Sequence, residues 1–255
     1  MDLAHGSLLD LIDLVVLTGG LAVAGFAKGV AGMGLPLVAT PILAGVFGPR
    51  MAVAIVTIPI FAANTLLLLQ GWKRLNVVRV ALPMAVASAV GTVIGVQLLA
   101  QLDQRTFALL ITAMVAVFLA RGDRLLGDDP NAVRARILGP VVGLIGGTLQ
   151  GTTSIASPVV GSYFHALRLS PRDFVIVLAA IFELNSVIQL VGYTSLGLMT
   201  AEVWAIGLVG LVPTLLALAL GIWLRGRMDP VAFRRLIVVL LVLSVANLLW
   251  RSFAG

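Results

Sequence analysis

Two runs of small residues interrupt the apolar stretches of this 255-residue sequence, and their composition suits anion binding. The first reads GFAKGVAGMGLPLVATP over residues 25–41, and the second reads GLIGGTLQGTTSIASP over residues 143–158. Glycine tolerates positive φ and proline leaves a carbonyl unpaired, so both runs predict broken helices. A helix that restarts after such a break presents free N–H groups and the positive end of its dipole, which together hold an anion without a charged side chain.

We therefore predict a substrate-binding site at the two breaks, with additional hydrogen-bond donors from neighbouring hydroxyl and amide groups. Its predicted members are Lys28, Gly29, Gly32, Gly34, Pro36, Asn64, Gln150, Gly151, Thr152, Thr153, Ser154 and Asn185, with Ser157 as a further donor. An alternative for the glycines is that they only allow helices to pack closely. Lys28 also has two explanations, attraction of the anion or a side chain that snorkels from a helix end to the membrane surface.

Glu183 and two asparagines are further polar residues near the centres of apolar runs. An ionisable group is costly there, so we expect Glu183 either to carry a coupling proton or to tie helices together as a neutral, hydrogen-bonded group. Asn64 recurs as Asn185, and the pair could line one cavity from two sides or bond between helices. Cysteine is absent and His5 and His165 look incidental, so we expect no metal site and no cofactor.

Ten apolar segments, five in each half, must position these residues. The chain is 60% hydrophobic and only 11% charged, whereas a soluble domain carries about 25% charged residues. The segments cover residues 8–28, 31–48, 52–70, 78–101, 106–121, 136–151, 154–168, 173–191, 200–224 and 233–251. Several are shorter than the roughly 20 residues of a membrane span, which predicts broken or re-entrant helices. We expect an all-α membrane protein, a polytopic helical bundle of about 8–10 transmembrane segments.

The two halves of the sequence repeat each other. Matching positions, in the same order, are Pro49-Arg50 with Pro171-Arg172, Asn64 and Gly71 with Asn185 and Gly192, Pro83 and Gly91 with Pro213 and Gly221, and Asp103 and Phe107 with Asp229 and Phe233. We predict a first transmembrane repeat over residues 1–121, a polar cytoplasmic linker over 122–135 and a second repeat over 136–255.

The basic residues predict the orientation of the chain. With the N-terminus outside, fourteen of the 17 Lys and Arg residues lie inside, and Arg50, Arg105 and Arg251 lie outside. An odd number of crossings in each half makes the repeats inverted, a plan typical of secondary transporters. The net charge of +6 then reflects membrane orientation and not nucleic-acid binding. Trp72, Tyr193 and Trp204, at segment ends, are expected to anchor the protein at the membrane interface.

The sequence resembles the sulfite exporter TauE/SafE family, bacterial permeases for sulfur-containing and other small organic anions. The resemblance rests on GFAKGVAGMGLP, PILAGVFGPRMAVA and GWKRLNVVRVALPMAVASAVGTVIGVQLLAQLDQRTFALL, and in the second half on SPRDFVIV and PTLLALALGIWLRGRMDPVAFRRLIVVLLVL. The breaks GMGLP and QGTTS depart from the G-x-G-G-G pattern that is usual in the family. The resemblance implies a multi-pass protein of the cell inner membrane that exports or imports sulfite, an organosulfonate or a carboxylate.

The sequence motifs favour some functions over others. An ATP-driven pump needs a GxxxxGK[ST] loop, which the sequence lacks, although a membrane subunit of a multi-component importer stays open. An intramembrane enzyme is disfavoured because HExxH, GxSxG and paired membrane carboxylates are missing. We therefore expect no enzyme, but a secondary transporter that works by alternating access, with a small anion and the lipid bilayer as partners. A proton or sodium ion is the expected coupling ion, and homo-oligomerisation is left open.

Overall fold

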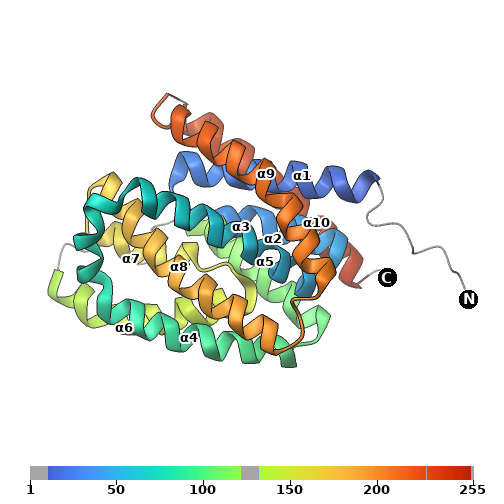
Figure 1. The fold of residues 1–255 in the computed structure, drawn as a ribbon, viewed down its shortest axis with the longest axis horizontal. Coiled ribbons are helices and arrows are strands. Elements are labelled where there is room, and N and C mark those ends of the chain that lie inside the picture. Colours follow the sequence, from blue (N-terminus) through green and yellow to red (C-terminus); the bar gives the residue numbers. More distant parts are fainter. Residues whose placement is uncertain (1–10, 122–131, 228, 254–255) are drawn as a thin grey trace, which may run out of the picture.

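The computed structural model describes residues 11–121, 132–227 and 229–253, and every regular element within them is helical (Figure 1). The elements are α1 (Leu11–Ala31), α2 (Leu35–Phe47), α3 (Pro49–Gln70), the 3-10 helix η1 (Trp72–Ala81), α4 (Leu82–Gln101), α5 (Gln104–Arg121), α6 (Ala132–Thr153), α7 (Ser157–Ala166), α8 (Pro171–Ser195), α9 (Ala201–Leu224) and α10 (Pro230–Phe253). Each of the ten apolar segments is therefore a helix, as predicted. Most of the predicted linker, 122–135, lies outside the described residues, and α6 begins within its last part.

The lengths and surfaces of the helices are those of a polytopic membrane protein. Within the described residues, five stretches are long and apolar enough to cross a bilayer: Asp13–Ala31, Pro49–Gln70, Trp72–Gln101, Pro171–Ser195 and Ala201–Leu224. Large apolar side chains such as Val90, Leu216 and Trp223 are exposed on the outside of the bundle. In contrast, α2 has 13 residues and α7 has 10, well below the roughly 20 that a span needs. The predicted broken helices are confirmed in these two places.

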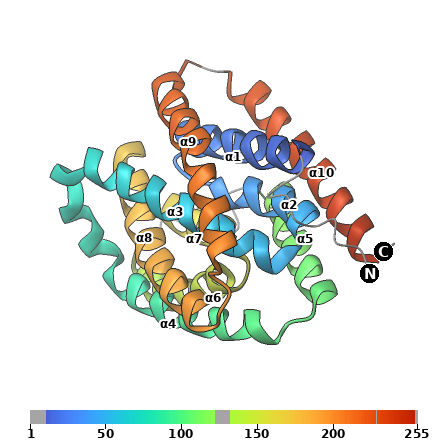
Figure 2. The ribbon, with the colours of Figure 1, turned by 45° about the vertical axis from the view of Figure 1, so that its right-hand side comes forward.

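Two close helix pairs join the first half of the chain to the second. Helix α1 lies along α9, and α4 lies along α6 (Figures 1 and 2). Gly29 meets Gly221 in the first pair, and Gly151 meets Gly95 in the second. A Cβ atom on any of these four glycines would overlap the backbone of the facing helix. Gly29 and Gly151 thus allow close helix packing, which was the alternative explanation for the glycines.

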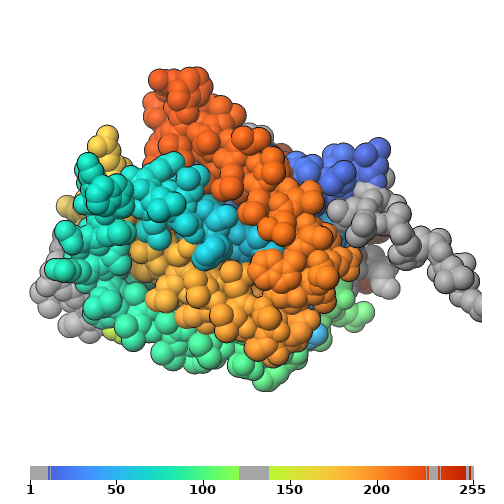
Figure 3. Space-filling model, in the orientation of Figure 1, coloured from blue at the N-terminus to red at the C-terminus, as the bar shows by residue number. Residues whose placement is uncertain are grey.

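Helices α3 and α8 cross the centre of the bundle in opposite directions. Thr65 of α3 bonds to Glu183 of α8, while Gly71, after the end of α3, lies against Ile176 near the start of α8. The ion pair of Arg74 with Asp173, at 2.9 Å, closes the same end. In the space-filling view the amber surface of α8 lies directly against the cyan of α3 (Figure 3).

Candidate functional site

The first break separates α1 from α2 and is built by two glycines in the left-handed region. Gly32 has φ +81° and Gly34 has φ +96°, a conformation that side-chain-bearing residues rarely adopt. Gly34 is the N-cap of α2, yet no side chain bonds to the first N–H groups of this helix. Pro36 follows in the first turn, where its missing N–H costs nothing. The dipole and remaining free N–H groups of α2 therefore stay available to a ligand.

The second break, between α6 and α7, has a similar form with different residues. Ser154 has φ +60°, and Ala156 is the N-cap of α7, again without a side-chain cap. Thr153 accepts a hydrogen bond from the backbone N–H of Ile155 at 3.1 Å and donates to Leu149 of its own helix. Two uncapped helix N-termini are thus present, as the sequence predicted.

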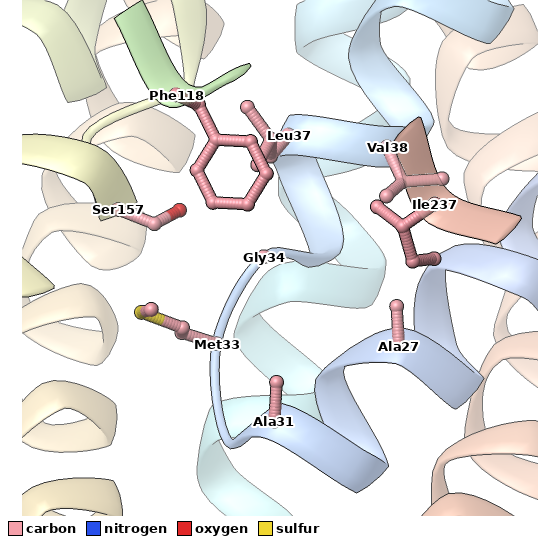
Figure 4. A pocket seen from close by; sticks show the side chains of 9 residues that line it. All are labelled: Ala27, Ala31, Met33, Gly34, Leu37, Val38, Phe118, Ser157 and Ile237. Atoms are coloured by element: carbon pink, nitrogen blue, oxygen red, sulfur yellow. The ribbon is translucent and has the colours of Figure 1, made fainter. Parts of the chain in front are cut away.

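A cavity of about 110 Å³ lies between the two breaks (Figure 4). Gly34 lines it from the first break, and Ser157, the first residue of α7, lines it from the second. The remaining lining side chains are mostly apolar: Ala27, Ala31, Met33, Leu37, Val38, Phe118 and Ile237. The Ser157 hydroxyl points into the space (Figure 4) and finds no hydrogen-bond partner among the described residues, although it is 1% exposed. A buried hydroxyl without a partner is costly, which suits a site that a ligand completes.

Lys28 and Asn64 form a second polar group beside the first break. Lys28 is 1% exposed, and its Nζ donates to Asn64 Oδ1 of α3 at 2.6 Å. The lysine therefore does not snorkel to the surface, which corrects that alternative. Asn64 Nδ2 is buried and has no partner in the described part of the chain. The pair presents a positive charge and a spare N–H donor, both suited to an anion.

Glu183 lies on α8 close to this pair. Its Oε1 accepts a hydrogen bond from Thr65 of α3 at 2.5 Å, and Ser186 lies 3.5 Å from its Oε2. The carboxylate is also near enough to Lys28 for the two charges to attract each other. Hydrogen bonds to the charged form and a neighbouring cation partly offset the cost of placing a carboxylate in the membrane. Glu183 thus ties α8 to α3 and shares its surroundings with the buried lysine.

A neutral network holds the second break. Gln189 Nε2 lies within hydrogen-bonding distance of the backbone carbonyl oxygen of Gln150 (2.8 Å) and of Ser154 Oγ (2.9 Å). The side-chain oxygen of Gln150, Oε1, has no partner in the described residues. Gln150 Nε2 bonds to Gln189 Oε1 at 3.1 Å, and the Tyr193 hydroxyl donates to the Gly151 carbonyl at 2.7 Å. Tyr193 is completely buried, so the prediction that it anchors at the membrane interface is wrong.

Of the predicted site residues, only Gly34 and Ser157 are among those that line the cavity. Thr152 bonds across to the Gly95 carbonyl of α4 at 3.2 Å, and Asn185 donates to Ser88 of α4 at 2.8 Å. Asn185 Oδ1 has no partner in the described residues. The two asparagines therefore each make an interhelical bond and each keep one unpaired amide atom. They are attached to different helices, Asn64 to α1 and Asn185 to α4.

Two functional contacts were missed by sequence reasoning. Gln189 is a polar residue inside an apolar run, and the argument applied to Glu183 would have found it. Arg225, just after α9, donates from Nε (3.0 Å) and Nη2 (2.7 Å) to the Gly29 carbonyl. These two residues are 196 positions apart, and nothing local in the sequence connects them.

Comparison with protein families matches residues 17–248, nearly the whole described chain, to the family described as Sulfite exporter TauE/SafE. No curated protein and no solved structure matches the sequence. The match confirms the resemblance to this family that the sequence predicted, and it agrees with the multi-pass helical structure. The chain belongs to the sulfite exporter TauE/SafE family of membrane transporters.

Proposed function

We propose that this protein is a secondary transporter that moves a small oxyanion across the inner membrane, coupled to an ion gradient. Sulfite, an organosulfonate or a carboxylate is the expected cargo. The observation that carries the proposal is the cavity of about 110 Å³ between two uncapped helix N-termini, with the unpaired Ser157 hydroxyl on its wall. Free N–H groups, helix dipoles and a hydroxyl donor all favour the anionic form of a ligand.

Alternating access between inverted repeats is the proposed mechanism. Three observations support it. The first is that α1 packs against α9 in the same way as its counterpart in the second half, α6, packs against α4, the counterpart of α9. Gly29 and Gly151 occupy matching places in these pairs, each next to a break. The equivalent helices α3 and α8 run in opposite directions. Two halves of opposite orientation can exchange conformations and open the cavity first to one side and then to the other.

Charge compensation during transport is proposed for Lys28 and Glu183. The buried ammonium would attract the anion toward the breaks, while Asn64 offers a further donor. Glu183 would take up or release a coupling proton, because it is an ionisable group within a membrane span and bonds only to the neutral Thr65 and Ser186 among the described residues. An anion that arrives at Lys28 weakens the attraction between the two residues and so favours protonation of the carboxylate.

Flux measurements with the purified protein in liposomes test the proposal. Sulfite, methanesulfonate, sulfoacetate and acetate are loaded in turn, without ATP and without partner proteins. Ser157→Ala is expected to raise the KM of the transported anion about tenfold, since a hydrogen bond to a charged group contributes about 1.5–3 kcal/mol. Ser162→Ala is the matched control, because the Ser162 hydroxyl bonds to the Pro158 carbonyl of its own helix.

Two results would contradict the proposal. Absence of flux for every anion without a partner would favour a subunit of a larger importer. An unchanged KM in Ser157→Ala, with normal folding, would place the anion elsewhere.

A further inference from the structure

Three arginines surround a second cavity at the end of the bundle where α3 ends, α8 begins and α9 ends. We call it the vestibule. It has a volume of about 290 Å³, and its lining residues are Leu67, Gln70, Gly71, Arg74, Arg172, Val175, Ile176, Ile222 and Arg225. The basic loops place this end on the predicted cytoplasmic side. It is separate from the cavity at the breaks, with which it shares no lining residue.

The charges of the vestibule are only partly compensated. Arg74 pairs with Asp173 at 2.9 Å, and this carboxylate is the one acidic group that contacts the three arginines in the described residues. Arg172 is exposed and forms no hydrogen bond or ion pair within the described part of the chain. Among the described residues, Arg225 bonds only to the neutral Gly29 carbonyl. A net positive charge facing a concave, partly apolar wall concentrates anions from solution.

The floor of the vestibule closes it from the polar groups inside the bundle. Leu67, Val175 and Ala179 form a small buried cluster. Leu67 lies one turn from Asn64 on α3, and Gly32 of the first break packs on Val175. The break, the apolar floor and the vestibule are therefore in direct contact.

Arg225 links the vestibule to the first break. Its guanidinium holds the Gly29 carbonyl with two N–H groups, and Gly29 adjoins Lys28. Guanidinium groups bind oxyanions more strongly than carbonyls, because both partners are charged and two parallel hydrogen bonds can form. An oxyanion in the vestibule would compete for these N–H groups and release the carbonyl that fixes the break.

We propose that the vestibule binds the oxyanion on the cytoplasmic side, through Arg74, Arg172 and Arg225, before the anion reaches the breaks. This inference rests on the proposed function for the identity of the anion. Binding there also weakens the Arg225 bond to Gly29, so occupancy of the vestibule loosens the first break.

The native sequence contains no cysteine, so one introduced thiol reports on the vestibule alone. Gln70→Cys places this thiol among the arginines. It is treated in detergent with anionic sulfonatoethyl methanethiosulfonate and, separately, with its cationic trimethylammonioethyl analogue. The reference is the ratio of the anionic to the cationic labelling rate for 2-mercaptoethanol in solution. We expect this ratio to be about tenfold higher for the thiol in the vestibule. Methanesulfonate should slow the labelling in a saturable manner.

Arginine variants in the Gln70→Cys protein identify the charges responsible. Arg172→Gln and Arg225→Gln are each expected to lower the preference for the anionic reagent at least threefold. Arg227→Gln is the control, since Arg227 lies two residues beyond Arg225 but stacks on Trp223 and does not line the vestibule. Equal rates for the two reagents, no protection by methanesulfonate, or an equal effect of Arg227→Gln would overturn the proposal.

Transport measurements separate this inference from the proposed function. With sulfite presented to the cytoplasmic side, Arg172→Gln should raise the KM several-fold and leave the maximal rate unchanged. An unchanged KM would overturn the role of the vestibule in transport. Charge-selective, protectable labelling in a protein that moves no anion would instead support the binding site and refute the proposed function.

Discussion

The two breaks have the same outline but hold their glycine carbonyls in different ways. At the first break, the Gly29 carbonyl is bound by Arg225, a charged residue on the rim of an open vestibule. At the second, the Gly151 carbonyl is bound by the buried, neutral Tyr193. The residue before each glycine also differs, being the charged Lys28 in one half and Gln150 in the other. On the proposed function, the first break would respond to anions and the second would stay fixed.

If the two halves are the predicted repeats, the comparison indicates how the two breaks specialise. Both breaks need a glycine where two helix backbones touch, and both retain it. In the proposed transporter a charge is required only once, because one anion would occupy one cavity and a second buried lysine would have to be compensated by a second carboxylate. The neutral network of Gln150 and Gln189 gives the second break its hydrogen bonds without that cost.

The largest effect is expected where the two breaks are alike. Gly29→Leu and Gly151→Leu each place a Cβ into the backbone of α9 or α4. We expect both to lose several kcal/mol of stability, about 3 kcal/mol or more, and to give little folded protein. Thermal unfolding and the yield of monodisperse protein measure this. Gly34→Ala is the control, as it meets no atom within 4 Å and suffers only the strain of its positive φ. A normal melting temperature in Gly29→Leu would refute the close helix contact.

The next effect separates the breaks. Lys28→Met removes the buried charge, and we expect anion flux to fall at least about 100-fold. Stability should fall as well, because Asn64 Oδ1 loses its donor and Glu183 loses the nearby cation. Gln150→Met should instead keep most of the flux, while stability falls by about 1–3 kcal/mol because Gln189 loses a partner. Liposome flux and thermal unfolding of the two variants are compared. Equal losses of flux would show that the breaks share one role.

A smaller effect is expected from Glu183→Gln. The amide oxygen can still accept the hydrogen bond from Thr65, so the contact between α3 and α8 is kept. If Glu183 carries the coupling proton, flux driven by a pH gradient should fall about tenfold, while exchange of anion at equal pH persists. A pH-gradient dependence equal to that of the parent protein would leave Glu183 only its structural role.

Much of the fold followed from hydropathy, whereas the details of the site depended on contacts that no local pattern reveals. Hydrophobic runs with glycine and proline at their ends locate the ten helices and both breaks, since lipid forces each segment to satisfy its own backbone. The burial of Lys28 is different. A lysine three residues before a helix end ordinarily reaches water, and the hydrogen bond to Asn64 on α3 holds this one inside. Tyr193 was misjudged for the same reason, since its partner lies 42 residues away.

The subtlest effect concerns the glycine carbonyls themselves. Tyr193→Phe frees the Gly151 carbonyl in a dry environment, and the melting temperature should fall by a few degrees, as one neutral hydrogen bond contributes about 1 kcal/mol. Arg225→Gln frees the Gly29 carbonyl next to a solvent-accessible vestibule, so we expect a smaller loss, because water can replace the guanidinium. Hydrogen exchange should rise at the second break in Tyr193→Phe and at the first break in Arg225→Gln. In the parent protein, methanesulfonate should raise hydrogen exchange at the first break and not at the second. If methanesulfonate raises hydrogen exchange equally at both breaks, the anion weakens the Tyr193 hydrogen bond as much as the Arg225 hydrogen bond, and the proposed difference between the breaks is wrong.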